Sequence, residues 1–416
     1  MTTEQQKIQF LNVVKVHLSR SADDSTDTLN PNTFEDISAL LELAAAHKLL
    51  PAAVDALHTL PEAESCPEFA AYKRAARLQV IQQAQRAQEF SEVYKKLTEY
   101  GIRALAVKGC VCRAVWPKGD LRTSGDEDVY VRDADFGKAC EALKECGLVC
   151  LVCDERADPE KDFEIGWRKP NSTLYIELHR RLFSPEGASA DLQVFFDDAF
   201  ERAQEYEVEH GTAKVWSMSP EDHLLYLILH AYKHFIHSGF GIRQVCDIGL
   251  WAKRYGSEVD HNHIMENLEK AHALYFAAAV FAIAKEDLGI DLQLPECWDA
   301  IKVDREPMLE DLLDAGVYGG SSMSRQHSAP LIQEAVAASR EDRKKAGLLK
   351  RAFPPKEKLI RDYPELKEHP AKLPLVWIKR LVKYSKETKN STNNSAVESI
   401  RIAKEREELL RLYRII

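Results

Sequence analysis

The feature that most constrains this chain is a short apolar run that ends in a glycine, followed by two aspartates two positions apart. The run covers residues 102–107 and is closed by Lys108 and Gly109. The aspartates, Asp126 and Asp128, stand directly before a second apolar run. Side chains at positions i and i+2 of a strand point to the same side. The pattern therefore predicts two strands with a glycine turn after the first, and both carboxylates within reach of one divalent cation.

A glycine turn beside two aligned carboxylates suits metal-assisted phosphoryl or nucleotidyl transfer. Glycine lets the backbone approach a phosphate closely, and carboxylate oxygens are the hard ligands that Mg²⁺ prefers. Two such ions can clamp the attacking and leaving oxygens of an in-line displacement. The alternative is a solvated acidic turn, because the D-x-D pattern alone is common.

Composition sets the broad class of the chain. Its 416 residues are enough for about two to three domains, and the hydrophobic content of 45% is ordinary for a globular protein. The formal charge of -10 argues against a broad basic face for nucleic acid. No apolar run is long enough to cross a membrane, and the N-terminal segment lacks the pattern of a signal peptide. We therefore expect a cytoplasmic protein with reduced cysteines.

Two cysteine pairs raise the alternative of a structural zinc site. Cys110 and Cys112 are two positions apart, and Cys150 and Cys153 form a C-x-x-C pair. The first spacing is poor for a zinc knuckle, and apolar residues separate the second pair. We therefore favour free thiols that are buried or partly buried.

Hydrophobic periodicity predicts an α+β fold, in which a small mixed β-sheet is flanked by helical regions at both ends of the chain. Helices are expected over 34–60 with a break near Pro51, over 67–100 with Gly101 at the end, and over 135–147. Strands are expected over 102–107, in the segment that ends at Val131, over 148–155 and over 171–178.

A strong helix start opens the second half of the chain. Ser219 can cap the helix, Pro220 suits its first position, and Asp222 adds an acid in the first turn. Helical periodicity continues from there, with a polar, glycine-rich break at 316–329, a mobile loop at the start of 386–399 and a charged amphipathic helix over 395–416. The expected regions are a helical region at 1–100, an α/β core at 101–218, a helical domain lining the cleft at 219–290 and a helical extension at 291–416.

Several motifs follow one another in an order that is found in a known group of proteins. They are Val107-Lys108-Gly109, Arg122, Asp126-Glu127-Asp128, Glu177-Leu178-His179, His230 with His234, and Arg243 with Asp247. Together they resemble the polymerase-β-like nucleotidyltransferase superfamily, and within it the branch of uncharacterised nucleotidyltransferase-fold proteins. The resemblance covers about residues 35–260. The chain differs from the wider superfamily in having Lys108-Gly109-Cys110 where Gly-Gly or Gly-Ser is usual, and Glu127 where an apolar residue is common.

The resemblance implies that Asp126, Asp128 and Glu177 are catalytic and that they bind Mg²⁺ or Mn²⁺. Glu177 would also accept the proton of the acceptor hydroxyl. An isolated acid in an apolar strand is costly to bury unless it is paired or bound to metal. For Glu177 the alternative is an ion pair with Arg180 or Arg181.

Cations and histidines are expected to complete the site. The candidates for binding the nucleotide phosphates are Lys108, Gly109 and Arg122, with the arginine as a bidentate fork. The candidates for lining the cleft are His179, His234 and Arg243, with Asp247 beside them. A zinc site at His230 and His234 is an alternative that lacks an H-E-x-x-H signature.

The leading hypothesis is therefore a Mg²⁺-dependent nucleotidyltransferase that moves a nucleoside monophosphate from an NTP such as ATP to a hydroxyl. The acceptor is expected to be a small molecule or a protein, because the acidic balance disfavours RNA. An alternative is a catalytically inactive nucleotide-binding or scaffold protein of the same fold, which the missing serine after Gly109 favours. A third reading is a helical interaction protein that docks a partner through 395–416, although we favour packing of that helix within the molecule.

Overall fold

A mixed seven-stranded sheet with the order β3-β4-β5-β2-β1-β7-β6 lies at the centre of the fold. The computed structural model describes residues 4–19, 36–151, 162–208, 213–316, 323–340, 356–360, 363–379 and 396–416. The strands are β1 Leu105–Val107, β2 Glu127–Tyr130, β3 Val149–Cys150, β4 Glu164–Arg168, β5 Tyr175–His179, β6 Gln204–Val208 and β7 Ala213–Ser217. β2 runs antiparallel to β1 and parallel to β5, which brings the glycine end of β1 beside the start of β2.

The four predicted strands are present but shorter than expected. The run at 102–107 is a strand only in its last three residues, and in the part of the run at 148–155 that the structure describes, 148–151, the strand covers Val149–Cys150. Residues 152–161 lie outside the described part of the chain. β4, β6 and β7 have no counterpart among the predicted strands. β6 carries two glutamates and exposes most of its residues, so its pairing with β7, rather than a local apolar pattern, defines it as a strand.

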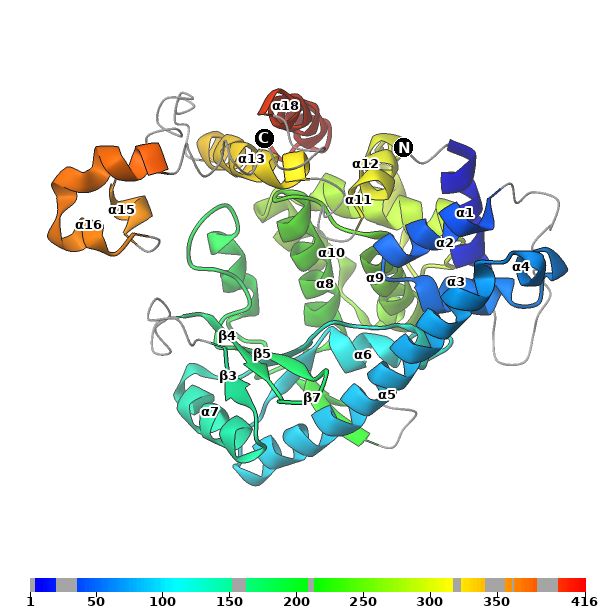
Figure 1. The fold of residues 1–416 in the computed structure, drawn as a ribbon, viewed down its shortest axis with the longest axis horizontal. Helices are drawn as coiled ribbons and strands as arrows, with labels where there is room; N and C mark the ends of the chain where they lie inside the picture. The colour runs from blue at the N-terminus through cyan, green and yellow to red at the C-terminus, as the bar shows by residue number, and fades with distance from the viewer. Residues whose placement is uncertain are drawn as a thin grey trace.

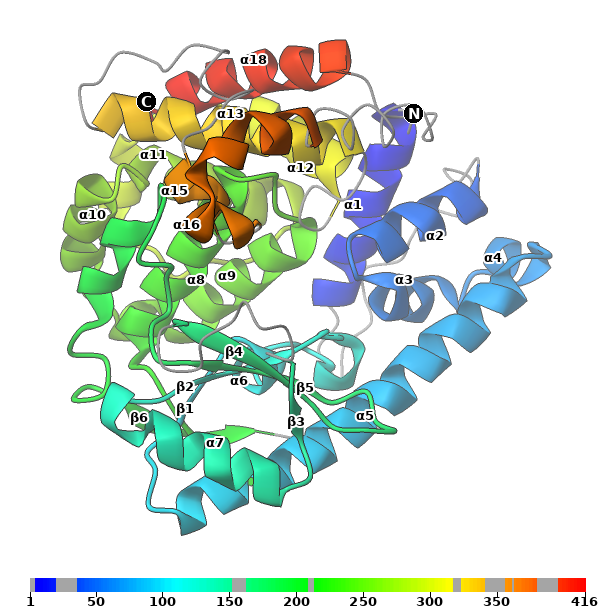
Figure 2. The same ribbon diagram turned by 60° about the vertical axis from the view of Figure 1, so that its left-hand side comes forward.

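Helices surround the sheet and account for both ends of the described chain. They are α1 Glu4–Ser19, α2 Ile37–Ala46, α3 Leu50–Leu57, α4 Pro61–Ser65, α5 Phe69–Glu99, α6 Gly109–Arg113, α7 Phe136–Glu145, α8 Pro220–Phe235, α9 Ile242–Tyr255, α10 His261–Lys270, α11 Leu274–Ala282, α12 Glu306–Ala315, α13 Met323–Arg340, α15 Lys356–Leu359, α16 Glu365–Glu368 and α18 Ala396–Leu412. Figures 1 and 2 show α5 and α7 on one side of the sheet and α8 and α9 on the other. The α+β prediction is confirmed.

Local signals place several helix ends correctly. The break predicted near Pro51 falls between α2 and α3, and the proline lies in the first turn of α3, where its missing N–H removes no helical hydrogen bond. α5 and α7 are followed by Gly101 and Gly147 with φ of 71° and 78°. At the start of α8, Ser219 Oγ accepts a hydrogen bond from the Asp222 backbone N–H at 3.1 Å. These ends depend on residues that are close in sequence, which is why the pattern predicts them.

The C-terminal region differs from the prediction at one break. α13 begins at Met323, so the break predicted over 316–329 is too long. The loop predicted at the start of 386–399 lies outside the described residues as far as position 395. α18 packs within the molecule, as we favoured. Tyr413 Oη accepts from the Met308 backbone N–H at 3.0 Å, and Arg406 donates to the backbone oxygen of Phe235.

One apolar core extends from Phe10 in α1 to Ile415 after α18. A second, small cluster contains Leu359, Leu366 and Val376. The first core includes residues from the N-terminal helices, the sheet and the later helices, so burial of apolar surface joins these parts. Among the described residues, no helix is long and apolar enough to span a bilayer.

A buried histidine, His47, will make the protein less stable as the pH falls. His47 is fully buried, stacks on Phe10 and accepts a hydrogen bond from the Ile242 backbone N–H at 3.3 Å. Burial lowers its pKa to about 4, against a smaller raising effect of the Leu313 backbone. Because the unfolded chain binds a proton near pH 6.5 and the folded chain does not, stability is lost as pH falls from 6.5 through 4.

We expect the wild type to lose up to about 3 kcal/mol more of its unfolding free energy over this range than His47→Gln loses. Urea unfolding at pH 7 and pH 4.5 measures the difference. His58→Gln removes an exposed histidine and serves as the control. Equal losses in the wild type and His47→Gln would contradict the expectation.

Candidate functional site

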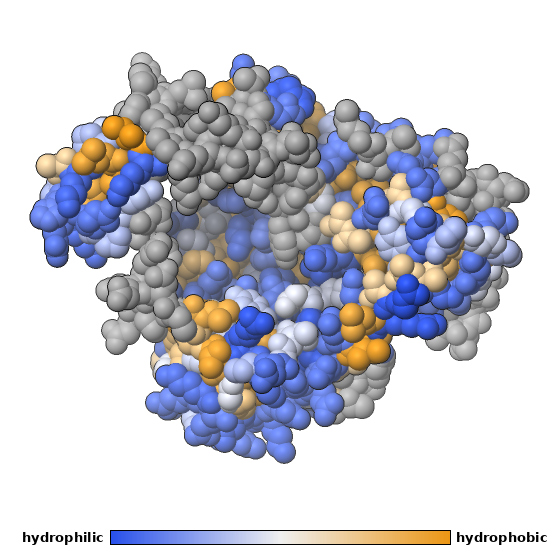
Figure 3. Space-filling view, viewed as in Figure 1, coloured by the Kyte–Doolittle hydropathy of each residue, from blue (hydrophilic) through white to orange (hydrophobic). Residues whose placement is uncertain are grey.

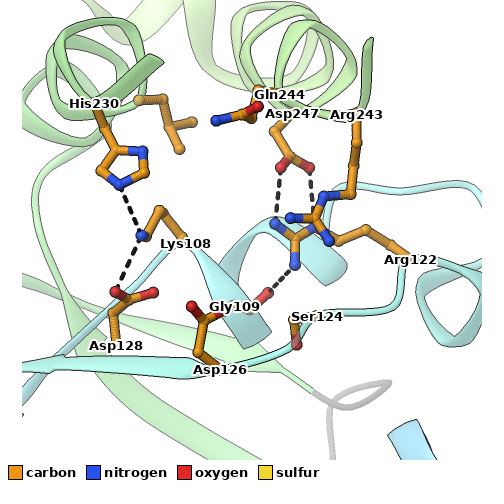
Figure 4. A pocket seen from close by; sticks show the side chains of 11 residues that line it. Lys108, Gly109, Arg122, Ser124, Asp126, Asp128, His230, Arg243, Gln244 and Asp247 are labelled. Carbon is orange, nitrogen blue, oxygen red and sulfur yellow. Dashed lines mark hydrogen bonds and ion pairs between the residues drawn. The ribbon is translucent and has the colours of Figure 1, made fainter. Parts of the chain in front are cut away.

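A polar cavity lies where the glycine end of β1 and the start of β2 face α8 and α9. Its empty volume, counted together with the open solvent at its mouth, is about 430 Å³, and it is lined by Lys108, Gly109, Arg122, Ser124, Asp126, Asp128, Leu227, His230, Arg243, Gln244 and Asp247. The space-filling view in Figure 3 shows this face of the molecule hollowed between the sheet and the helices above it. Figure 4 shows Asp126 and Asp128 directed into the cavity from the sheet. The cavity therefore brings together residues from both halves of the chain.

The turn after β1 has an unusual backbone that α8 helps to hold. Lys108 has a φ of 56°, a region that residues with a side chain rarely adopt. Its backbone N–H donates to His223 Nε2 at 3.1 Å, and its Nζ lies 3.1 Å from His230 Nε2. Both histidines belong to α8, so this helix contacts the main chain and the side chain of the same lysine.

Glu127 fills the space behind Gly109, on the opposite side of β2 from the two aspartates. A Cβ atom at Gly109 would overlap Glu127 Oε2. That oxygen accepts from the Cys110 backbone N–H at 3.1 Å, and Oε1 accepts from Arg113 Nη1 at 2.7 Å and from Ser124 Oγ at 3.2 Å. Only 1% of Glu127 is exposed. The glycine is thus required by the close approach of a buried, paired carboxylate.

The long helix α5 fixes the segment that leads into Asp126. Gln83 Oε1 accepts from the Ser124 backbone N–H at 2.9 Å, and Arg86 donates to the Ser124 backbone oxygen. Sequence reasoning missed Glu127, Arg113, Gln83 and Arg86 as parts of the site's support. A buried acid between two candidate ligands, with an arginine in the helix before it, is the signal that could have indicated them.

The acidic residues meet through the pairing of β2 with β5. In this parallel pair, Asp128 stands opposite Glu177 and Tyr130 opposite His179. Asp128, Glu177 and His179 each offer one ligand atom, and these atoms all lie within 4.8 Å of one another. Asp126 lines the cavity but does not belong to this group. Within the described residues, this is the one cluster of His, Cys, Asp and Glu with the spacing for a metal ion.

The two zinc alternatives find no support in the described chain. Neither Cys110 and Cys112 nor His230 and His234 belong to a cluster with metal-ligand spacing. Cys110 and Cys112 are buried thiols outside any disulfide, and Cys150 is a partly buried one. Cys153 lies outside the described residues.

The charges around Asp128 and Glu177 are unbalanced in a way that favours a cation. Burial disfavours the charge of Asp128, but Lys108 and His179 lower the pKa of this carboxyl well below its usual value. Lys108 Nζ lies 3.0 Å from Asp128 Oδ1. Burial, followed by the charges of Asp128 and Asp126, raises the pKa of Glu177 to about 7. A divalent cation beside these groups would favour the ionised form of Glu177.

The donor set fits a divalent metal. Carboxylate oxygens suit Mg²⁺ and Mn²⁺, and an imidazole nitrogen suits transition metals. Asp128 and His179 are almost fully buried, whereas 29% of the Glu177 side chain is exposed. An ion held here would therefore keep access to the open side of the cavity.

Arg122 lines the cavity but is held by Asp247. Its Nε and Nη2 donate to the two carboxylate oxygens at 2.9 and 2.7 Å, and its Nη1 donates to the Gly109 backbone oxygen at 3.4 Å (Figure 4). Trp116 Nε1 also donates to Asp247, at 2.8 Å. The Arg122 guanidinium, which was expected to bind a phosphate, forms a bidentate ion pair with the Asp247 carboxylate. This ion pair joins the sheet side of the cavity to α9.

The histidines of α8 are neutral groups near the cavity. His230 lines the cavity, whereas His234 is not among its lining residues and has its Nε2 at 3.3 Å from His230 Nε2. Burial, followed by neighbouring cations, lowers the pKa of both well below the usual value. Arg243 lines the cavity and donates to the Thr123 backbone oxygen at 2.6 Å. Gln244, Ser124 and Leu227 also line the cavity and are not among the residues predicted for the site.

The sheet, the glycine turn and the acids that face its end define a class of site suited to phosphoryl-group chemistry. A family model described as "Uncharacterised nucleotidyltransferase" matches residues 34–289, more than half of the chain. The chain belongs to this uncharacterised nucleotidyltransferase family, and the membership makes nucleotidyl transfer its general activity. No curated protein matches the chain.

Proposed function

We propose that this protein uses Mg²⁺ or Mn²⁺ to transfer a nucleoside monophosphate from an NTP such as ATP to a hydroxyl group of a small molecule or protein. The observation that carries the proposal is the position of Asp126, Asp128 and Glu177. The two aspartates enter the cavity beside the Gly109 turn, and strand pairing sets Glu177 opposite Asp128. The family match extends across all of these residues.

Each part of the site has a role in this reaction. Asp128 and Glu177 would hold the metal, with Asp126 contributing from the strand start, and the metal would neutralise charge on the phosphates. Gly109 lines the cavity where the phosphates would lie, and Lys108 and Arg243 supply positive charge. Catalysis then consists of positioning and charge stabilisation.

The sheet side would bind the NTP, while the helical side would select the acceptor. α8 and α9 contribute His230, Arg243, Gln244 and Asp247 to the opposite wall of the cavity. We therefore assign acceptor choice to the region 219–290, next to an α/β core at 101–218 and helical regions at 1–100 and 291–416. The net charge of -10 favours a small-molecule or protein acceptor over nucleic acid, and the reduced thiols favour the cytoplasm.

A second candidate is a catalytically inactive nucleotide-binding protein. Two observations favour it. Cys110 follows Gly109 where the superfamily often has serine, and Lys108 Nζ lies 3.0 Å from Asp128 Oδ1, which supplies a protein cation to the acid that the metal needs. Nucleotide binding without transfer would identify this case.

The deciding experiment incubates the protein with α-³²P-labelled NTPs, Mg²⁺ or Mn²⁺ and a cell lysate. The test variant is the double substitution Asp126→Asn, Asp128→Asn. The matched control is Asp133→Asn, Asp198→Asn, which removes the same charge from exposed positions. We expect label on a small-molecule or protein fraction with the wild type and the control, and none with the test variant, because the variant has lost two of the three acids.

The fraction that carries the label identifies the acceptor class. Label on RNA would correct the acceptor assignment. Absence of label in every fraction, with NTP binding still measurable by calorimetry, would replace the proposal with the inactive nucleotide-binding protein.

A further inference from the structure

His179 is a buried residue whose ring lies between carboxylates on both sides. It is the last residue of β5, and only 4% of its side chain is exposed. Its Nε2 lies 3.2 Å from Asp128 Oδ1 and 3.7 Å from Glu177 Oε2. Its Nδ1 lies 3.5 Å from Glu164 Oε2 but makes no hydrogen bond of good geometry. Both ring nitrogens therefore face carboxylate oxygens.

A neutral imidazole cannot satisfy both of these sides. It carries one N–H donor and one nitrogen lone pair. If Nε2 carries the hydrogen, the lone pair of Nδ1 faces Glu164. If Nδ1 carries it, the lone pair of Nε2 faces Asp128 and Glu177. A lone pair directed at a carboxylate oxygen is unfavourable, because both groups are acceptors.

A second proton on the ring would satisfy both sides, because both nitrogens would then donate, but a metal ion satisfies them with the ring neutral. A cation bound by Asp128, Glu177 and Nε2 meets three acceptors at once, while Nδ1–H is directed at Glu164. The arrangement of a carboxylate, a histidine and a metal recurs in metalloproteins, where the carboxylate fixes the tautomer and the orientation of the ring. The spacing of the three donor atoms, all within 4.8 Å of one another, agrees with a shared ion.

We propose that His179 is a direct metal ligand through Nε2, that Glu164 is its positioning residue, and that this imidazole makes the site select Mn²⁺ over Mg²⁺. Mg²⁺ is a hard ion that binds oxygen and gives up its waters reluctantly, whereas first-row transition ions accept imidazole nitrogen. The inference deepens the proposed function and rests on it only in requiring a cation at Asp128.

Pulsed electron paramagnetic resonance of bound Mn²⁺ tests the ligand directly. The nucleus of a coordinated imidazole nitrogen couples to the electron spin, so the full-length wild type will show a ¹⁴N signal. His179→Gln removes the imidazole and will abolish this signal. His263→Gln changes an exposed histidine of α10 and will retain it. Mn²⁺ bound to the wild type without a ¹⁴N signal would overturn the inference.

Calorimetric titration with Mn²⁺ and with Mg²⁺ tests the selectivity. Loss of the ligand in His179→Gln will weaken Mn²⁺ binding by at least about tenfold, and Glu164→Gln will weaken it by about tenfold while keeping the ¹⁴N signal. Mg²⁺ binding will change much less in His179→Gln. Equal losses for the two ions, or no Mn²⁺ binding by the wild type, would contradict the selectivity.

A second variant covers the case in which His179→Gln does not fold, which circular dichroism will reveal. His179→Glu supplies an oxygen donor in place of nitrogen and will shift the preference toward Mg²⁺. The labelled-NTP experiment separates this inference from the proposed function. A ¹⁴N signal without transfer would leave the inference standing and remove the function. Transfer without a ¹⁴N signal would do the reverse.

Discussion

Replacing Glu127 with alanine will lower the free energy of unfolding by about 3–5 kcal/mol, the cost of breaking a buried ion pair by removing one partner. Arg113 and Glu127 are 4% and 1% exposed, and their side chains meet at 2.7 Å. The substitution leaves the Arg113 charge buried without its carboxylate. It also removes the acceptor of the Cys110 backbone N–H. Urea unfolding at pH 7.5 will measure the loss.

Two controls separate this cost from a general effect of removing an acid. Glu201→Ala breaks an exposed pair with Arg132 and will cost much less stability than Glu127→Ala, because water screens an exposed ion pair. The double substitution Arg113→Met, Glu127→Met replaces the pair with apolar groups and will recover much of the stability that Glu127→Ala loses. Similar losses for Glu127→Ala and Glu201→Ala would show that the pair has no special role.

Glu177→Gln will have the opposite effect on stability and will weaken the stabilisation by metal. The pKa of Glu177 is raised to about 7 in the folded chain, by burial and by the neighbouring aspartates. The protonated Glu177 therefore makes its full contribution to the free energy of unfolding below pH 4.5, the pKa of this group in the unfolded chain. This contribution is lost as pH rises through 7. At pH 8 the ionised carboxylate costs stability in the metal-free protein. Glutamine removes up to about 3 kcal/mol of this cost.

Thermal melting with EDTA at pH 5 and pH 8 will show the pattern. We expect Glu177→Gln to exceed the wild type at pH 8 and to match it at pH 5. Adding Mn²⁺ at pH 8 will raise the melting temperature of the wild type more than that of the variant. Glu207→Gln changes an exposed glutamate on β6 and will leave both comparisons unchanged. If Glu177→Gln is less stable than the wild type at pH 8, the ionised Glu177 carboxylate does not destabilise the metal-free protein.

The sequence predicted those parts of the site that depend on short spacing. Asp126 and Asp128 lie on one side because alternation along a strand is local. The helix start at Ser219 and the glycines that follow α5 and α7 are local for the same reason. The grouping of Glu177 with Asp128 could only be inferred from family resemblance, because strand pairing between β2 and β5 joins residues that are far apart in sequence.

The remaining features of the site depend on partners that other elements of the fold supply. Arg122 looks like a free phosphate contact until α9 supplies Asp247. Glu127 looks like a departure from an apolar position until α6 supplies Arg113. His179 was expected to line the cleft, and only the strand register shows that it approaches Asp128. In each case the partner belongs to another helix or strand, which only the folded chain brings close.

The contact between Gly109 and Glu127 also determines the order in which these two positions can change during evolution. A larger residue at 109 overlaps the carboxylate as long as glutamate stands at 127. A smaller or apolar residue at 127 must therefore come first, together with a change at Arg113. Relatives that carry a side chain at the position of Gly109 are expected to lack a glutamate at the position of Glu127.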